Sequence, residues 1–183
     1  MLRRSLLTLE RSTVTKRKMA EERQVAFAAL SPLLEETLRL GGTAELTATG
    51  NSMRPMMLHR RSKIRLAALT AEPKRGDVLL YRRRDGHYVL HRLIEAGDTL
   101  TMCGDAQWHP EPGIERSQVL AILEAFSRKG KRWVSCDAGH YRAYWRFWLA
   151  IRPLRRLVFG GSRRLLRELK RLFGSRGLRK EHT

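Results

Sequence analysis

The pattern of apolar positions changes twice along the chain and predicts helix, then sheet, then helix. In residues 19–41 most apolar side chains recur at spacings of three and four, as on one face of a helix, and the Gly41-Gly42 pair ends the run. Pro32 lies inside this segment and, in the alternative interpretation, opens a second helix. We therefore expect an N-terminal arm and helix over residues 1–43.

The middle of the chain contains short runs rich in Val, Ile, Leu and Tyr, separated by Gly, Asp and Pro. Such runs predict β-strands with turns between them, and Asp85-Gly86 between two runs is a hairpin signal. We therefore predict a β domain of six or seven strands over residues 44–136. The expected strands are Glu45–Thr49, Lys63–Leu69, Asp77–Arg82, His87–Glu95, Thr99–Cys103, Gln118–Phe126 and Lys131–Ser135.

After Gly139 the pattern is helical again. Tyr141–Val158 combines aromatic residues with Arg and is interrupted at Pro153, and Ser162–Phe173 has leucines on one face and basic residues on the rest. We expect basic amphipathic helices over residues 137–183. The predicted fold class of the whole chain is α+β, with a mainly β domain flanked by an N-terminal helix and the basic C-terminal helices.

The charge of the chain limits its partners. The 183 residues include 37 Lys and Arg against 18 Asp and Glu, for a formal net charge of +19. This balance excludes an acidic, cation-binding protein and predicts an anionic partner. Three interpretations of residues 141–173 stay open: packing on the β domain, contact with an anionic membrane surface, and nucleic-acid binding, which is the least favoured.

The sequence shows no segment typical of membrane insertion or export. It lacks a run of about 18 apolar residues, and its N-terminus lacks the apolar region of a secretory signal. Two cysteines, Cys103 and Cys136, make no disulfide framework. We expect a cytoplasmic protein, with peripheral contact at the inner membrane face left open. No metal-ligand spacing or phosphate-binding loop is found, so we expect no metal and no cofactor.

The segment with the most chemical content is Gly50-Asn51-Ser52-Met53-Arg54-Pro55. A serine in a turn led by glycine can be exposed, with its backbone N–H close to its own hydroxyl. A nucleophile needs that exposure, and the N–H group can bind the oxyanion that forms on attack. By itself the pattern is more typical of an ordinary turn, since turns are rich in Gly, Asn, Ser and Pro.

Three further motifs follow in order: Arg75-Gly76-Asp77-Val78, Leu90-His91-Arg92 and Gly104-Asp105-Ala106. Together with the serine motif, this series resembles the signal peptidase I family and the related self-cleaving repressor peptidases. The resemblance extends over residues 45–135, about half of the chain. It implies a β-rich peptidase fold, Ser52 as the nucleophile, and a peptide or protein substrate. It also assigns four neighbours of the serine to the substrate groove and oxyanion region: Gly50, Asn51, Met53 and Pro55.

The resemblance further places His91 where the endoplasmic-reticulum, archaeal and sporulating-bacterial type has its general base. An unperturbed histidine is mostly neutral at pH 7 and can accept the serine proton. The acid that orients the base corresponds to Asp105, and Glu111 stands where the family usually has a second Asp. Which of the two orients His91 is left open, and a turn-capping role fits Asp105 as well. His59 is the weaker candidate base and is interpreted as a turn residue.

Two departures from the family pattern leave more than one function open. Residues 56–62 lack the Gly-Asp pair that commonly follows the serine motif, and the expected membrane anchor is missing. The leading hypothesis is a serine endopeptidase with a Ser–His dyad or triad. The alternative is a non-catalytic peptide-binding or regulatory module on the same fold. A DNA-binding repressor ranks third, because residues 1–42 contain no convincing helix-turn-helix. For Met53 and Pro55, structural roles are favoured over catalytic ones.

Overall fold

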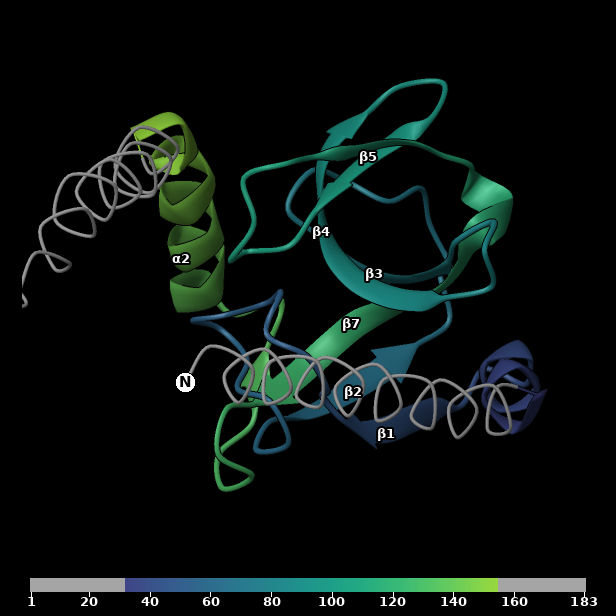
Figure 1. Cartoon of the computed structure of the whole chain (residues 1–183). Helices are drawn as coiled ribbons and strands as arrows, with labels where there is room; N and C mark the ends of the chain where they lie inside the picture. Colours follow the sequence, from purple (N-terminus) through teal and green to yellow (C-terminus); the bar gives the residue numbers. More distant parts are fainter. Residues whose placement is uncertain (1–31, 155–183) are drawn as a thin grey trace, which may run out of the picture. The chain divides into compact units, whose positions relative to one another are not determined.

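The computed structural model describes residues 32–154, which fall into two units divided between Ala138 and Gly139. The first unit is an antiparallel sheet of eight strands (Figure 1). The strands are β1 (Thr43–Thr47), β2 (Lys63–Ala67), β3 (Val78–Arg82), β4 (Tyr88–Ala96), β5 (Leu100–Cys103), β6 (Glu111–Ile114), β7 (Val119–Ser127) and β8 (Val134–Ser135), with a short 3-10 helix at Arg116–Gln118. The prediction of a mainly β protein is confirmed.

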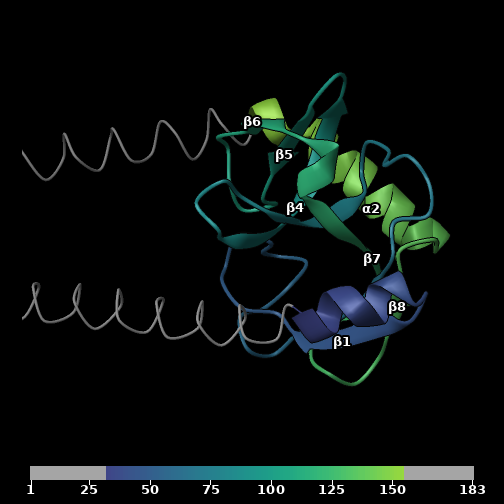
Figure 2. The ribbon, with the colours of Figure 1, turned by 90° about the vertical axis from the view of Figure 1, so that its right-hand side faces the viewer.

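Strand β7 connects the two halves of the sheet. The strand order is β1-β2-β7-β3-β4-β5-β6, and β8 also pairs with β7. The last residues of β7 pair with β2, and its first residues pair with β3. Strands β3, β4 and β5 curve together at one end of the unit, while β1 and β2 lie at the other end (Figures 1 and 2).

One face of the curved strands forms the hydrophobic core. Because side chains alternate along a strand, every second residue points to this face. The fully or nearly fully buried members of the cluster are Leu79, Tyr81, Leu93, Leu100, Met102 and Ile114. His91 belongs to the same alternating series of β4 as Leu93, so it faces this core rather than the opposite side of the sheet.

The strand predictions succeed wherever periodicity and turn signals agree. Each of the seven predicted segments overlaps an observed strand. The hairpin at Asp85-Gly86 is confirmed, with Gly86 at a φ of 83°. Strand β6 lies outside the predicted segments, since its Pro112 and Gly113 are residue types depleted in strands. The prediction of a strand over Lys131–Ser135 is too long, because only its last two residues form one.

The predicted stop of the N-terminal helix is also confirmed. Residues 32–39 are helical, and Gly41 adopts a φ of 76°. The N–H groups of Gly41 and Gly42 donate to the carbonyl groups of Leu38 and Thr37, at 2.9 Å each. This pair of bonds is a Schellman motif, which favours glycine at its left-handed position. Residues 1–31 of the predicted arm and helix lie outside the part that the structure describes.

The second unit contains helix α2 (Gly139–Ala150). Its aromatic rings stack one turn apart, with centroids 6.4 Å apart for Tyr141 and Tyr144 and 5.9 Å apart for Tyr144 and Trp148. The predicted interruption near Pro153 is seen as a turn at residue 151. The predicted helix Ser162–Phe173 lies outside the described residues. Within residues 32–154, no helix is both long and apolar enough to cross a membrane.

Candidate active site

Ser52 lies on the loop that connects β1 to β2, and hydrogen bonds across the base of this loop hold it in shape. The N–H of Arg60 donates to the carbonyl of Ala48 at 2.9 Å. The N–H of Gly50 donates to Nδ1 of His59, also at 2.9 Å. Gly50 has a φ of 91°, in the left-handed region that favours glycine. His59 therefore acts in the turn, in agreement with its interpretation as a turn residue.

The side chains of this loop alternate between anchors and exposed groups. Met53, Met56 and Met57 are buried and fix the loop on the domain. Asn51 and Pro55 are exposed, and Ser52 is half-buried. Within residues 32–154 neither the hydroxyl nor the backbone N–H of Ser52 forms a hydrogen bond. Both groups are thus available to a bound peptide.

The turn after β5 is in direct contact with the backbone of Ser52. The N–H of Ala106 donates to the Ser52 carbonyl at 2.7 Å. A Cβ atom at Gly104 would lie 2.7 Å from that same carbonyl oxygen and 3.0 Å from the Ser52 Cβ. Contacts this short leave no room for a side chain at position 104. The glycine of the Gly104-Asp105 motif is therefore required by its close approach to the serine loop.

The sheet register connects the strand of His91 to the turn that contacts Ser52. Arg92 on β4 pairs with Cys103, the last residue of β5. Gly104, the next residue, packs against the backbone and Cβ of Ser52. No hydrogen bond joins the side chains of Ser52 and His91 in the described part of the chain.

The nearest groups to His91 define which of its nitrogens carries the proton. The Tyr81 hydroxyl lies 3.2 Å from Nδ1 of His91 and donates to Oε2 of Glu111 at 2.8 Å. A phenol has a single hydrogen, and an ionised carboxylate can only accept, so the Tyr81 hydrogen points to Glu111. Nδ1 must then be the donor to the Tyr81 oxygen. This chain of bonds leaves the lone pair on Nε2 of His91, the nitrogen that a general base uses.

Burial and charge fix the ionisation of the pair. Burial lowers the pKa of His91 to about 4, and the nearby charge of Glu111 offsets only part of this effect. Burial alone would raise the pKa of Glu111, but the hydrogen bonds from Arg83 and Tyr81 outweigh it and the pKa is lowered. Arg83 contacts Glu111 through Nε at 2.6 Å and through a second nitrogen. At pH 7 the carboxylate is charged and the imidazole is neutral.

Asp105 lies on the other face of β4, away from His91. Both of its oxygens accept hydrogen bonds from the fully buried Arg92, at 2.8 Å each. Arg92 also donates to the carbonyl of Gly76 at 2.7 Å and contacts the sulfur of Met56. Residues from three sequence motifs, and Met56 just after the serine motif, thus meet at one guanidinium. Within residues 32–154, the carboxylate within 4 Å of His91 is that of Glu111, at 3.9 Å from Nδ1.

No family model, no curated protein and no solved structure matches the chain. The function therefore has to follow from the chemistry of the site. Its parts are a half-buried serine, a neutral histidine and an ionised glutamate, and the described residues contain no group of three or more His, Cys, Asp or Glu arranged to hold a metal. Acid–base and nucleophilic chemistry is what such a set can perform.

Sequence reasoning did not find three residues that shape the site: Tyr81, Arg83 and Arg92. A signal existed for Arg92, because a charged residue in an otherwise apolar strand needs a buried partner. For Tyr81 and Arg83 the signal was weaker. Only the pairing of β3 with β4 and of β5 with β6 shows that they face His91 and Glu111.

Proposed function

We propose that this chain is a serine endopeptidase and that its β unit has a signal-peptidase-like fold. The observation that carries the proposal is the hydrogen-bond chain from His91 Nδ1 through the Tyr81 hydroxyl to Glu111. From this chain we infer the tautomer of His91 that has its proton on Nδ1 and its lone pair on Nε2. Strand β5 pairs with the strand of this base and leads into a turn that contacts Ser52, whose hydroxyl is unengaged within residues 32–154. The order of the four motifs along the chain, and the meeting of three of them and Met56 around Arg92, support the fold assignment.

In this mechanism Ser52 Oγ attacks the scissile carbonyl carbon of an extended peptide. Nε2 of His91 takes the Ser52 proton as the new C–O bond forms, and then gives it to the nitrogen of the leaving amine as the C–N bond breaks. Water hydrolyses the resulting ester, with His91 again as the base. The imidazolium that forms transiently is stabilised by the nearby Glu111 carboxylate, through Tyr81.

The serine loop supplies the remaining groups. In this mechanism the N–H of Ser52, which forms no hydrogen bond within residues 32–154, donates to the oxyanion. Gly50 and Asn51 are exposed beside the nucleophile and border the path of the substrate. The buried Met53 fixes the loop from the domain side. Pro55, which follows a cis peptide bond, has a structural role in the same turn.

Digestion of a proteome-derived peptide library, read by mass spectrometry of new termini, tests the proposal even though the substrate is unidentified. Wild-type protein is expected to produce a reproducible set of cleavages. Ser52→Ala and His91→Gln are expected to lower their rate by a factor of about 10² to 10⁴, the usual contribution of general acid–base catalysis.

Two matched controls make the result specific. Ser117→Ala removes an exposed serine hydroxyl, and His87→Gln removes an exposed imidazole. Both control proteins should cleave like wild type. Cleavage at the wild-type rate by the Ser52→Ala protein would refute the proposal, because the activity would then come from another group or from a contaminant.

A second candidate is a peptide-binding module without catalysis. The specific observation in its favour is that Ser52 and His91 are not hydrogen-bonded within the described residues. Catalytic hydrogen bonds are often long before substrate binds, so the distance alone does not decide. Peptides that are retained by the protein and recovered intact after long incubation would favour the binding module over the peptidase.

A further inference from the structure

Seven basic side chains are grouped on two loops and the first residue of β2, at one end of the β2–β7 pair, and we call this group the basic cluster. One loop leads into β2 and the other connects β7 to β8. All seven residues are exposed. They are Arg60, Arg61, Lys63, Arg128, Lys129, Lys131 and Arg132.

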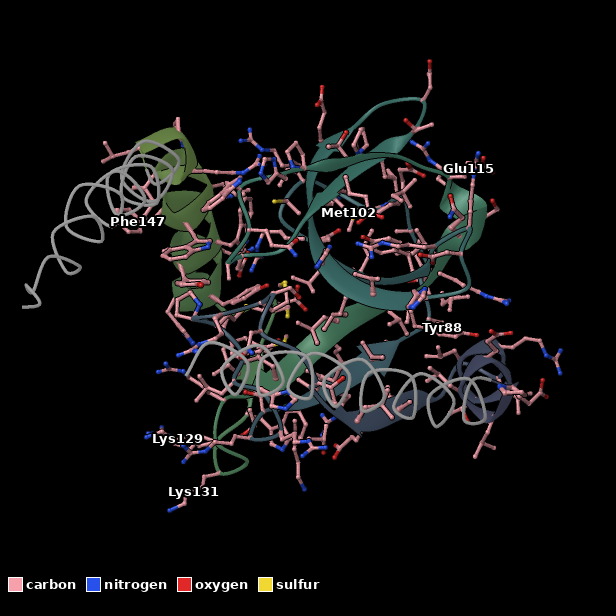
Figure 3. All side chains as sticks on the ribbon, in the orientation of Figure 1. Tyr88, Met102, Glu115, Lys129, Lys131 and Phe147 are labelled. Carbon is pink, nitrogen blue, oxygen red and sulfur yellow. The ribbon has the colours of Figure 1, made fainter. Side chains whose placement is uncertain are left out.

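Sheet pairing and a side-chain bond hold the two loops together. Lys63, the first residue of β2, pairs with Ser127, the last residue of β7. The buried Ser62 hydroxyl donates to the carbonyl of Arg128 at 2.8 Å and accepts from the N–H of Leu58 at the same distance. Figure 3 shows Lys129 and Lys131 at the outer end of the hairpin, with side chains directed away from the sheet. The cluster is thus a fixed surface rather than two independent loops.

The cluster is not neutralised by acidic neighbours. Within residues 32–154 none of its members forms a salt bridge, whereas arginines elsewhere on the unit do, such as Arg65 with Glu45 and Arg84 with Glu115. Neither loop contains an acidic residue. Like charges held this close repel one another, so the arrangement costs stability unless an anionic partner offsets it.

The position of the cluster connects it to the candidate active site. Arg60 and Arg61 lie on the same β1–β2 loop as Ser52. The N–H of Arg60 bonds to Ala48, and His59 bonds to Gly50, two residues before the serine. Ser52 and two members of the cluster therefore belong to one loop whose two sides are hydrogen-bonded to each other.

The composition of the cluster favours a polypeptide over a membrane. On the β7–β8 loop its one large apolar neighbour is Trp133, which is 39% exposed and whose ring is covered by Arg65 at 4.7 Å. Binding at a membrane interface needs buried apolar area in addition to positive charge. The other residues of that loop are charged or glycine, and the methionines of the β1–β2 loop are buried, so little apolar surface is available to enter a bilayer.

We propose that the basic cluster binds an acidic segment of the polypeptide that Ser52 cleaves. This inference rests on the proposed peptidase function and adds the substrate class, a chain with several Asp or Glu residues a short distance from the scissile bond. Charge pairing of this kind speeds encounter and fixes which stretch of the chain enters the site. The Lys and Arg side chains of the basic cluster select the substrate, and Ser52 and His91 carry out the cleavage.

The test uses the full-length Ser52→Ala protein, so that binding is measured without cleavage. A fluorescein-labelled peptide with five consecutive Glu residues is titrated, and its anisotropy is compared with that of a peptide in which Gln replaces each Glu. The Glu peptide is expected to bind more tightly, and its affinity should fall as salt is raised. Lys129→Gln/Lys131→Gln should raise the Kd of the Glu peptide about fivefold to tenfold, since each rim charge contributes modestly.

The matched control is Arg82→Gln/Arg84→Gln. These two exposed residues lie at the β3–β4 hairpin, and β3 pairs with the first residues of β7, the end opposite the cluster. The control should leave the Kd within twofold of the parent. Equal weakening by both double variants would overturn the inference, because the attraction would then be a general effect of net charge. Tighter cluster-dependent binding to phosphatidylglycerol vesicles or to a DNA duplex would overturn it in favour of that partner.

The two proposals fail in different ways. If the library digestion shows Ser52-dependent cleavage at sites without acidic neighbours, and the cluster variant cleaves them normally, the acidic-segment inference is wrong and the peptidase stands. If the Glu peptide binds through the cluster but the wild-type protein cleaves nothing, the peptidase proposal is wrong, and the cluster remains a binding site for acidic peptides.

Discussion

His91 and Arg92 are neighbours in β4, yet their side chains lie on opposite faces of the strand and meet different surroundings. Arg92 is fully buried and pairs with both oxygens of Asp105. His91 is 3% exposed and, within residues 32–154, bonds on one nitrogen only, to Tyr81. Both residues come from one motif of the sequence. The comparison shows that the Arg92 face of β4 holds the loops around it through the ion pair with Asp105. The His91 face leaves one imidazole nitrogen without a hydrogen bond in the described residues.

The environment of each residue explains this division. A buried charge without a partner costs several kcal/mol, so Arg92 needs the ion pair and the Gly76 carbonyl that it contacts. A neutral imidazole can stay buried with fewer bonds. The pKa of His91 is lowered to about 4 because burial penalises its charged form. The first arrangement is suited to holding loops in place and the second to accepting a proton.

Removal of Asp105 is expected to have the largest effect on stability. Asp105→Ala leaves the guanidinium of Arg92 buried without its counter-charge, which costs about 3–5 kcal/mol of unfolding free energy. The control is Glu45→Ala, which breaks an exposed pair with Arg65 and should cost less than about 1 kcal/mol. Chemical denaturation measures both. A loss of less than about 1 kcal/mol for Asp105→Ala would show that Arg92 does not depend on this pair.

The pH dependence of stability sharpens the comparison on the His91 side. The pKa of His91 is about 4 in the folded protein, against about 6.5 unfolded. Between these values the unfolded chain binds more protons, so the contribution to stability is complete above pH 6.5 and is lost as pH falls towards 4. The difference amounts to about 3 kcal/mol. The His91→Gln protein should lack this pH-dependent contribution. Its unfolding free energy should therefore fall less than that of wild type between pH 7 and pH 4.

Denaturation of wild type, His91→Gln and His87→Gln at pH 7, 5.5 and 4 measures this effect. The exposed His87 serves as the control, and its substitution should leave the pH dependence as in wild type. Parallel curves for wild type and His91→Gln would mean that His91 titrates near its ordinary value, and that the imidazole is hydrated rather than buried against the core.

Substitution of Tyr81 is expected to have the smallest effect of the three, and it tests the link between His91 and Glu111. Tyr81→Phe removes the acceptor of the Nδ1 proton and the donor to Glu111. The cleavage rate should fall about 10-fold to 100-fold through kcat, with KM little changed, since one hydrogen bond to a charged group contributes about 1.5–3 kcal/mol. Tyr88→Phe, on the neighbouring strand, is the control. An unchanged kcat for Tyr81→Phe would show that Tyr81 does not position the base.

The sequence predicts much of the fold, and the reasons can be seen in particular segments. Alternating runs on either side of Asp85-Gly86 give two strands and a hairpin at the expected places. Strand β6 is not predicted from the sequence because Glu111–Ile114 contains a proline and a glycine. The segment forms a strand through its pairing with β5. Local pattern is sufficient where it agrees with tertiary pairing and fails where pairing alone makes the strand.

The candidate site is predicted in part. The serine motif and His91 can be named from the sequence, but the choice between Asp105 and Glu111 cannot. Strand alternation places His91 and Arg92 on opposite faces, and the pairing of Glu111 with Met102 places that glutamate on the His91 face. These registers depend on bulges in the β4–β5 and β5–β6 pairs, which spacing along the chain does not reveal.

The central claim is that His91 is a neutral imidazole with its proton on Nδ1 and its lone pair on Nε2. The most direct test is the ¹⁵N NMR spectrum of the His91 ring in the Ser52→Ala protein, followed from pH 8 to pH 3.5. We predict the Nδ1–H tautomer at pH 7 and no protonation until the pH approaches 4. An Nε2–H tautomer at pH 7, or a pKa near 6.5, would contradict the account, because the nitrogen proposed as the general base would then hold the proton or would titrate as in water.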